Sequence, residues 1–357
     1  MEKALWVVRD KITSPGAIDD LMADATTRGI HDVVAQVRGR GDAYFGSTLE
    51  PQAEALEDPA FDPLGHLVRA GAAVGVRVHA WANVFFVWSS PSGALPRSSE
   101  HLVRKHPAWL LPPDRGGLPP HPLTLSGEMG ARTDRPSTFD RGGLPPHPLT
   151  LSGEMGARTD RPATLSYLDP VGGSDWEGIY TDPRNTEARE HTLAVFTDIV
   201  ARYRVEGFHY DYVRYPQAAY ASSPDDHTAV TALVREGATR LRSARPGIVI
   251  SAAVFPDPDA ARDRVLQRWP DWAREGWIDL LCPMAYRKDT SSVRALLTRA
   301  RKAAPRTRMW GGLMAYAGER RLIRDQVRAA KDAGCDGAIL FAYERTQRDL
   351  LDVFAAS

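Results

Sequence analysis

The chain has 357 residues, 43% of them hydrophobic, and its 45 basic and 45 acidic side chains give a formal net charge of zero. A balanced charge offers no net field to recruit nucleic acid or an anionic membrane, and no apolar stretch approaches the roughly 20 residues that cross a bilayer. The composition therefore predicts a globular protein with a neutral partner, and it argues against a nucleic acid-binding or membrane-spanning protein.

The first residues of the sequence indicate whether a signal peptide is present and hence in which compartment the protein is expected. The start Met1-Glu2-Lys3 leads directly into the apolar run 4–8. That run is too short for the hydrophobic region of a signal peptide, and no small-residue cleavage site accompanies it. As written, the chain is expected in the cytoplasm. A start codon further upstream would instead make it a secreted or cell-envelope protein.

Short apolar runs of strand length alternate with amphipathic helical stretches along the chain. Eight such runs are found, at residues 4–9, 32–38, 76–84, 206–212, 248–255, 278–284, 308–314 and 337–343. Eight strand-helix repeats are the number of a (β/α)8 barrel, which typically has about 250 residues. We therefore predict an α/β protein in which residues 1–357 form one (β/α)8, or TIM, barrel domain with a long inserted loop.

Helix boundaries are marked by capping residues and glycines. Four pairs place a capping side chain before a proline suited to the first helical turn, namely Ser14-Pro15, Asp62-Pro63, Asp182-Pro183 and Ser223-Pro224. Four glycines are expected at the left-handed position that ends a helix, namely Gly29, Gly75, Gly276 and Gly334. These signals predict where helices start and stop between the strands.

Alternation within the strands predicts which side chains point into the barrel, because successive residues of a strand face opposite sides. Val33, Ala35 and Val37 are expected to face the helices. The expected inward positions are Gln36, Arg38, His79, Trp81, Asn83, His209 and Asp211. The inward face becomes polar toward the carboxyl ends of the strands, which is where the active sites of such barrels lie.

Residues 86–181 form an insertion between the third and fourth strands, far longer than an ordinary connection of two to six residues. Residues 114–136 return unaltered as 140–162, a period of 26 residues that defines the copies 114–139 and 140–165. Two copies indicate a recent duplication or an assembly error in the gene, since a solenoid needs at least three units. The glycine- and proline-rich composition predicts a mobile surface excursion near the barrel top.

The densest group of polar and aromatic residues, GFHYDYVRYP at 207–216, ends the fourth strand. It resembles the fourth-strand signature of the family 10 glycosyl-hydrolase-like proteins, bacterial barrels assigned or inferred to act on glycans. Four other segments resemble that family, namely VAQVRGRGDAYFGS (34–47), FDPLGHLVRAGAAVGVRVHAWANV (61–84), LLCPMAY (280–286) and AILFAYE (338–344). The resemblance covers nearly the whole chain except the duplicated loop. It implies a glycosidase acting on a bacterial or related polysaccharide, with cell-wall glycan among the substrates it suggests.

Glycoside hydrolysis ordinarily needs two carboxyl groups flanking the scissile bond, one as nucleophile or base and the other as proton donor. Asp211 fits the first role, because it is expected to point into the barrel and Arg214 nearby can keep it ionised. The alternative is a structural carboxylate that pairs with Arg38 or Arg214 to tie loops together.

The proton donor has three candidates on other strands. Asp257 follows the fifth strand, Glu344 ends the eighth, and Asp42 lies beyond the second. Each also has a structural alternative. Asp257 is placed to cap the turn before the next helix and Asp42 to cap a loop, while Glu344 is placed to pair with Arg345 or Arg348. Spacing alone ranks Glu344 and Asp257 equally.

Sugars present flat C–H faces, so glycan sites combine aromatic side chains with polar groups that bond hydroxyls. The residues predicted to bind substrate are Arg38, Asp42, Trp81, Asn83, Arg214, Tyr215, Tyr286 and Tyr343. His79 and His209 sit deeper in their strands and are expected to be hydrogen-bonded core residues. The competing hypothesis is a carbohydrate-binding barrel that has lost turnover, favoured if no second carboxyl group reaches Asp211.

No metal and no cofactor are predicted. Cys282 and Cys335 lie in apolar surroundings and are expected to be a buried, reduced pair. Two cysteines cannot form a four-sulfur zinc site, and no histidine run accompanies them. A barrel enzyme that uses a metal or a phosphate is disfavoured too, because the chain lacks a histidine cluster at strand ends and a glycine-rich phosphate loop.

Overall fold

The computed structural model of the chain describes residues 1–90, 94–111, 178–216, 224–315 and 320–357. Its centre is a closed barrel of parallel strands in the order β1-β10-β9-β8-β7-β6-β3-β2. The strands are β1 (Glu2–Val7), β2 (Asp32–Arg38), β3 (Arg77–Asn83), β6 (Gly207–Asp211), β7 (Val249–Val254), β8 (Leu280–Pro283), β9 (Arg308–Met314) and β10 (Gly337–Phe341). The predicted (β/α)8 barrel is confirmed, and each predicted strand overlaps an observed one.

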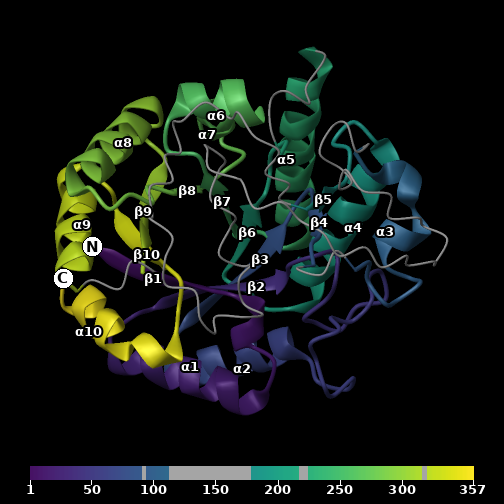
Figure 1. Cartoon of the computed structure of the whole chain (residues 1–357), viewed down its shortest axis with the longest axis horizontal. Helices are drawn as coiled ribbons and strands as arrows, with labels where there is room; N and C mark the ends of the chain where they lie inside the picture. Colours follow the sequence, from purple (N-terminus) through teal and green to yellow (C-terminus); the bar gives the residue numbers. More distant parts are fainter. Residues whose placement is uncertain (91–93, 112–177, 217–223, 316–319) are drawn as a thin grey trace, which may run out of the picture.

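The helices form a ring around this barrel, and the two ends of the chain lie side by side where the barrel closes (Figure 1). They are α1 (Pro15–Thr27), α2 (Pro63–Val74), α4 (Thr186–Arg202), α5 (Pro224–Ala244), α6 (Pro258–Val265), α7 (Trp269–Arg274), α8 (Thr290–Ala303), α9 (Arg320–Asp332) and α10 (Arg348–Ala356). No helix in the described ranges is long and apolar enough to cross a membrane.

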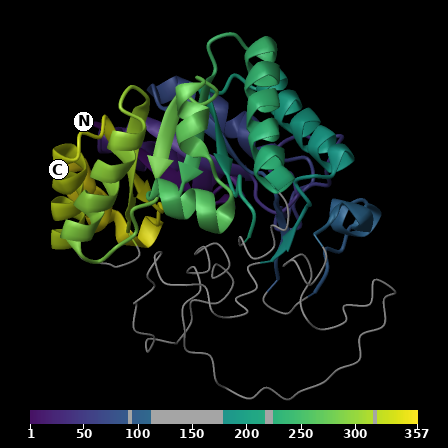
Figure 2. The same ribbon diagram turned by 90° about the horizontal axis from the view of Figure 1, so that it is seen from above.

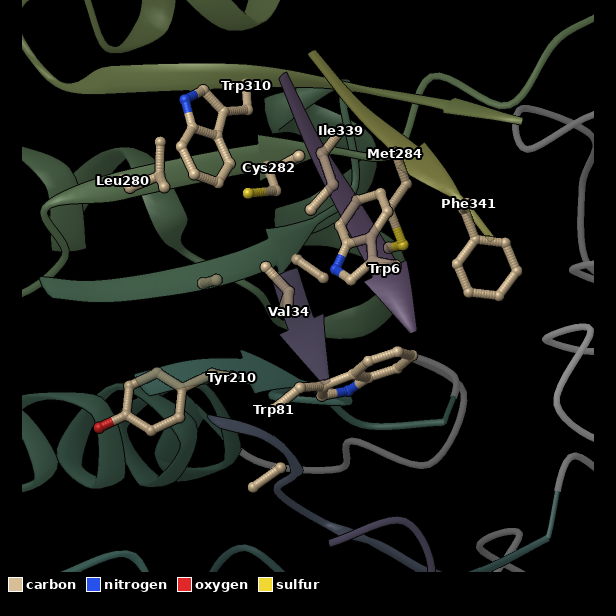
Figure 3. Close-up of a cluster of buried hydrophobic side chains, with 14 of the residues drawn as sticks. Trp6, Val34, Trp81, Tyr210, Leu280, Cys282, Met284, Trp310, Ile339 and Phe341 are labelled. Atoms are coloured by element: carbon tan, nitrogen blue, oxygen red, sulfur yellow. The ribbon is translucent and has the colours of Figure 1, made fainter. Parts of the chain in front are cut away.

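Aromatic side chains fill the interior of the barrel. The Trp6 ring packs edge-on against the rings of Phe341 and Tyr286, with centroids 6.0 and 6.3 Å apart, and Trp81 packs edge-on against Phe341. Tyr210 instead points away from this cluster toward the helices (Figure 3). The alternation read from the sequence is therefore confirmed for β3 and β6, and it leaves the polar inward positions at the carboxyl ends of the strands.

Two of the four capping signals are confirmed and one is wrong, while the fourth, Ser223, lies outside the described residues, although α5 does begin at Pro224. Ser14 caps α1 and Asp62 caps α2, each accepting from a backbone N–H of the first turn. The predicted start at Asp182 is wrong. There the carboxylate accepts from the N–H of Arg184 inside a turn, and Asn185 caps α4 instead. The four predicted terminal glycines all have positive φ, from 62° to 81°, as a left-handed C-terminal residue requires.

A bulge in β2 overturns the predicted direction of Arg38. The register with β3 runs evenly to Gln36 and shifts between Gln36 and Arg38, so Val37 is an extra residue and the chain beyond it changes sides. Arg38 lies over the Phe196 ring of α4, 5.8 Å from its centroid, and forms an ion pair with Glu50 at 2.6 Å. Arg38 therefore faces the helices and not the barrel axis.

The described ends of the insertion pack together. Strand β4 (Phe86–Trp88) pairs antiparallel with β5 (Ile179–Tyr180), and an isolated bridge joins Leu110 to Thr181. A short helix, α3 (Leu102–Lys105), stands beside this pair and away from the barrel (Figure 2). The duplicated segment, 114–139 and 140–165, lies outside the described residues.

Candidate functional site

A chain of hydrogen bonds crosses the carboxyl ends of the first three barrel strands. Arg9, just beyond β1, donates to the Gln36 side chain at 2.9 Å, and Gln36 donates to Asn83 Oδ1 at 3.2 Å. Asn83 Oδ1 also accepts from Trp81 Nε1 at 3.1 Å, while its Nδ2 donates to the Gly39 carbonyl. Asn83 is thus fixed in position by both ends of its amide.

Asp211 lies next to Asn83 across the β3–β6 ladder, at the carboxyl end of β6. Its side chain is on the inward face and the residue is 4% exposed. Its Oδ1 accepts from the N–H of Tyr212 at 2.7 Å, and its carbonyl accepts from Val84 N at 2.7 Å. The carboxylate predicted as nucleophile or base is therefore held at the strand end beside a polar network.

The backbone directly after Asp211 is strained. Tyr212 has φ of 50°, a left-handed conformation that residues with a Cβ adopt only when the surroundings impose it. Those surroundings are visible, because the Phe86 ring stacks on Tyr212 at 4.7 Å and the Arg214 guanidinium lies 4.8 Å from the centre of the same ring. Such strain concentrates at functional sites, where it re-aims a side chain.

Two of the three acid candidates, Asp257 and Glu344, differ in how they are held. Asp257 caps α6 with Oδ1, accepting from the N–H groups of Asp259 and Ala260, and its Oδ2 forms an ion pair with Arg299 at 2.6 Å. Both carboxylate oxygens of Asp257 are thus engaged, and Oδ1 has the helix-capping role that was the structural alternative to catalysis. Glu344 is 41% exposed and pairs with Lys11 at 3.0 Å, not with either nearby arginine. Glu344 is the better placed candidate.

The aromatic candidates fall into two groups. Trp81 and Tyr286 belong to the interior cluster around Trp6 and are 1% and 5% exposed. Tyr215 and Tyr343, predicted as sugar platforms, direct their hydroxyls to carboxylates of the helix layer, Asp226 of α5 at 3.1 Å and Asp24 of α1 at 2.9 Å. A buried phenol needs such a partner, so these two tyrosines tie strand ends to helices.

Asp42 occupies the loop after β2, buried, with Oδ1 accepting from the N–H of Arg40 at 2.9 Å. This is the loop-capping role considered as its alternative, and it uses only one carboxylate oxygen. Arg214, also buried, donates to the carbonyls of Tyr215 and Pro216 at 3.2 and 3.4 Å. Both side chains thus lie in the loops at the carboxyl end of the barrel.

Sequence reasoning missed Arg9. Its buried guanidinium is part of the network that positions Asn83, and it runs beneath Gly39, where a Cβ would come within 2.7 Å of Arg9 Cδ. The signal was the glycine itself, because a residue without a side chain in a polar loop leaves room for a long neighbour. In the described parts of the chain, no group of three or more His, Cys, Asp or Glu residues is arranged to hold a metal ion.

No protein-family model matches the chain. Over 95 residues the chain is 28% identical to "Glycosyl hydrolase YngK" of Bacillus subtilis (strain 168), a match that covers 25% of this chain and 19% of that protein. The chain therefore matches about a fifth of the length of that curated relative.

Solved structures share the architecture over the whole chain. An alpha-L-fucosidase isoenzyme 2 from Paenibacillus thiaminolyticus aligns with TM-score 0.57 and 16% identity, covering 99% of this chain and 48% of that one. An endo-beta-1,4-mannanase from Thermotoga petrophila gives 0.58 and 10%, covering 99% and 76%. One from Rhizomucor miehei gives 0.56 and 10%, covering 100% and 95%. At these identities the likeness shows the fold, a (β/α)8 barrel.

Proposed function

We propose that the chain is a glycoside hydrolase, similar to the family 10 glycosyl-hydrolase-like proteins, that acts on a bacterial or related polysaccharide. The observation that carries the proposal is Asp211, an inward and buried carboxylate at the end of β6, adjacent to Asn83 and followed by the strained Tyr212. The partial match to a curated glycosyl hydrolase and the glycosidase barrels of the same fold support it.

In this mechanism Asp211 is the nucleophile or base and Glu344 the proton donor. The barrel order leaves three strands between β6 and β10 in either direction, so the two carboxylates start from opposite sides of the axis. That is the arrangement a bond needs when it is attacked from one side while its leaving oxygen is protonated from the other. Asn83, fully buried and bonded at both ends of its amide, serves in this mechanism to hold the strand ends beside Asp211.

Substitution of the two carboxylates tests the mechanism. Asp211→Asn keeps the shape and removes the negative charge, so it should lower turnover of every substrate by about a hundredfold or more while oligosaccharide binding persists. Glu344→Gln should impair substrates with poor leaving groups far more than activated aryl glycosides, which do not need the proton. Asp257→Asn, whose carboxylate caps α6, is the control and should retain turnover in the folded fraction.

A carbohydrate-binding barrel without turnover is the second candidate. It is favoured by the engagement of both Asp257 oxygens and by the ion pair of Glu344 with Lys11, because neither of these two acid candidates then presents a free carboxyl group. The same assays separate the two functions. Oligosaccharide binding without any hydrolysis by the wild-type chain would establish the binding module, and hydrolysis that survives intact in Asp211→Asn would end the proposed mechanism.

A further inference from the structure

The strand ladder that carries Asp211 continues beyond it toward the insertion root, which is the pair of strands β4 and β5. The N–H of Val84 donates to the Asp211 carbonyl at 2.7 Å. The N–H of Phe85 then donates to the Tyr212 carbonyl at 3.3 Å. From the far side of the insertion, the N–H of Thr181 donates to the Phe85 carbonyl at 2.9 Å. Both ends of the insertion are therefore tied to the end of β6.

Three aromatic rings pack together at the same place. The Phe86 ring of β4 stacks on the Tyr212 ring, with centroids 4.7 Å apart and planes inclined by 29°. The Tyr180 ring of β5 meets both edge-on, 5.5 Å from Phe86 and 6.1 Å from Tyr212. All three side chains are buried, and the Arg214 guanidinium lies 4.8 Å from the Tyr212 ring. The Tyr212 side chain is thus held by both strands of the insertion root and by its own loop.

These rings hold a residue whose backbone conformation needs support. Tyr212 has φ of 50°, where the Cβ of any residue other than glycine crowds the backbone. Such a residue stays in this conformation only when the surrounding structure imposes it. The N–H of the same residue donates to Asp211 Oδ1 at 2.7 Å. The carboxylate is therefore held by the residue that the rings hold.

We propose that the insertion root positions the Asp211 carboxylate. The Phe86 and Tyr180 rings keep Tyr212 in its left-handed conformation. The N–H of Tyr212 in turn fixes Asp211 Oδ1 at the carboxyl end of the barrel. All three aromatic residues are positioning residues, because they act through Asp211. The inference rests on the proposed function, since it names the elements that align the nucleophile or base of the same site.

Removal of one ring of the insertion root tests the proposal with the full chain. The probes are the 4-nitrophenyl glycosides of fucose, mannose, galactose and glucose, together with mannohexaose, and kinetics are measured on those that the wild type hydrolyses. Phe86→Leu keeps an apolar side chain and removes the stacked ring. It should lower kcat about tenfold or more and change KM less than about twofold, because a small misplacement of a reacting group affects the transition state more than ground-state binding.

The matched control makes the same substitution at a ring elsewhere in the core. Phe354 is fully buried in α10, away from the insertion root (Figure 1). Phe354→Leu should leave kcat unchanged, and urea unfolding of both variants shows that each is assayed in its folded state. In crystal structures, Phe86→Leu should lose the left-handed conformation of Tyr212 and its bond to Asp211, whereas Phe354→Leu should keep both.

A pair of variants at Tyr212 separates backbone conformation from packing. Tyr212→Ala and Tyr212→Gly both remove the ring, but only glycine adopts φ of 50° without steric cost. If the rings serve to hold this backbone, Tyr212→Gly should keep a kcat at least about threefold above that of Tyr212→Ala. If the ring is packing alone, glycine should be no better, because it also increases the flexibility of the chain. Should neither variant fold, Phe86→Leu decides by the criteria above.

Three results would overturn the inference: an unchanged kcat in Phe86→Leu, a Tyr212→Gly variant no faster than Tyr212→Ala, or wild-type conformations of Tyr212 and Asp211 in the crystal structure of Phe86→Leu. Its failure is separable from that of the proposed function, because the crystal structures require no turnover. A displaced Asp211 in Phe86→Leu, in a chain that hydrolyses nothing, would remove the glycosidase and leave the positioning by the insertion root. Hydrolysis that depends on Asp211 and is indifferent to Phe86 would remove the positioning and leave the glycosidase.

Discussion

His209 lies wholly inside the barrel between two hydrogen-bond partners. Trp6 Nε1 can only donate, so His209 Nε2, 3.1 Å away, is the acceptor, and the ring proton on Nδ1 is donated to Ser251 Oγ at 2.8 Å. Burial lowers the pKa of His209 from 6.5 to about 3, although the negative charge of Asp211 opposes the shift. The imidazole is therefore neutral at physiological pH and acts as a packing and positioning group beneath the candidate site.

This lowered pKa predicts a loss of stability in mild acid. The unfolded chain binds a proton at this histidine below pH 6.5 and the folded chain does not, so stability is complete above 6.5 and falls as the pH decreases toward 3. The loss should reach about 2 kcal/mol between pH 7 and pH 5. Urea unfolding at both pH values measures it.

The matched variants are His209→Gln and His31→Gln, the second at an exposed histidine. His209→Gln should be less stable at pH 7, because it disturbs the bonds to Trp6 and Ser251, and its stability should change less on going to pH 5. His31→Gln should follow the wild type. An unchanged pH dependence in His209→Gln would mean that another group causes the acid sensitivity.

Among the elements, β2 is the one whose irregularity has the largest consequences. The bulge at Val37 turns Arg38 to the helix side, where it meets Glu50 of the following loop and, through Glu50, His191 of α4 at 3.3 Å. Although burial opposes it, the charge of Arg38 together with the His191 hydrogen bond holds the pKa of Glu50 at about 2. The pair therefore joins β2, its loop and α4 beneath the surface.

Breaking this pair should be costly. Glu50→Gln leaves the buried Arg38 without its counter-charge, so we expect a loss of about 3 kcal/mol or more in the free energy of unfolding. The contribution of the carboxylate is present above pH 4.5 and is lost as the pH falls toward 2, so the deficit of the variant should shrink in acid.

The control for this variant is the exposed pair formed by Glu54 with Arg97 at 2.9 Å. Glu54→Gln should change the free energy of unfolding by about 1 kcal/mol or less, because a solvent-exposed ion pair contributes little. Equal losses in the two variants at pH 7, measured by urea unfolding, would refute a special role for the buried pair.

The same elements show how far the sequence alone can be read. Every barrel strand was predictable, because buried parallel strands are continuous apolar runs between polar turns. The direction of the Arg38 side chain was not predictable. One extra residue in a strand moves every later side chain to the opposite face, and no local sequence pattern marks where such a bulge occurs. The roles of Tyr215 and Tyr343 were not predictable either, because their carboxylate partners lie on other elements and only the closed fold brings them together.

At the candidate site the sequence located the strand ends and could not resolve the use of each carboxylate. Strand phase predicted that Asp211 ends the fourth strand on its inward face, and the structure places it there, while its catalytic role stays a prediction. The choice of proton donor between Asp257 and Glu344 depended on their partners in the fold. Asp257 is engaged by the N-terminus of α6 and by Arg299, whereas Glu344, within the described residues, pairs with Lys11. The network from Arg9 to Asn83 spans three strands, so no single stretch of sequence contains it.

At the scale of the whole molecule, the barrel closes independently of the insertion. Strand β10 pairs with β1 from Glu2 opposite Gly337 to Trp6 opposite Phe341, which joins the two ends of the chain. The insertion leaves and rejoins the barrel at one place, where β4 pairs with β5 and Leu110 is bridged to Thr181. The barrel strands and their helices all lie outside the duplicated segment.

Deleting one copy, residues 114–139, should therefore leave the barrel intact. The remaining copy 140–165 supplies the same sequence through its first 23 residues, and the paired ends of the insertion are retained. Shortening a loop between fixed ends reduces the entropic cost of closing it, here by less than about 0.6 kcal/mol. We therefore expect the free energy of unfolding to change by no more than about 1 kcal/mol. Deleting residues 140–165 instead removes the same length and should give the same result. Urea unfolding of both deletions decides: a loss of several kcal/mol, or a clear difference between the two, would show that an individual copy packs against the barrel.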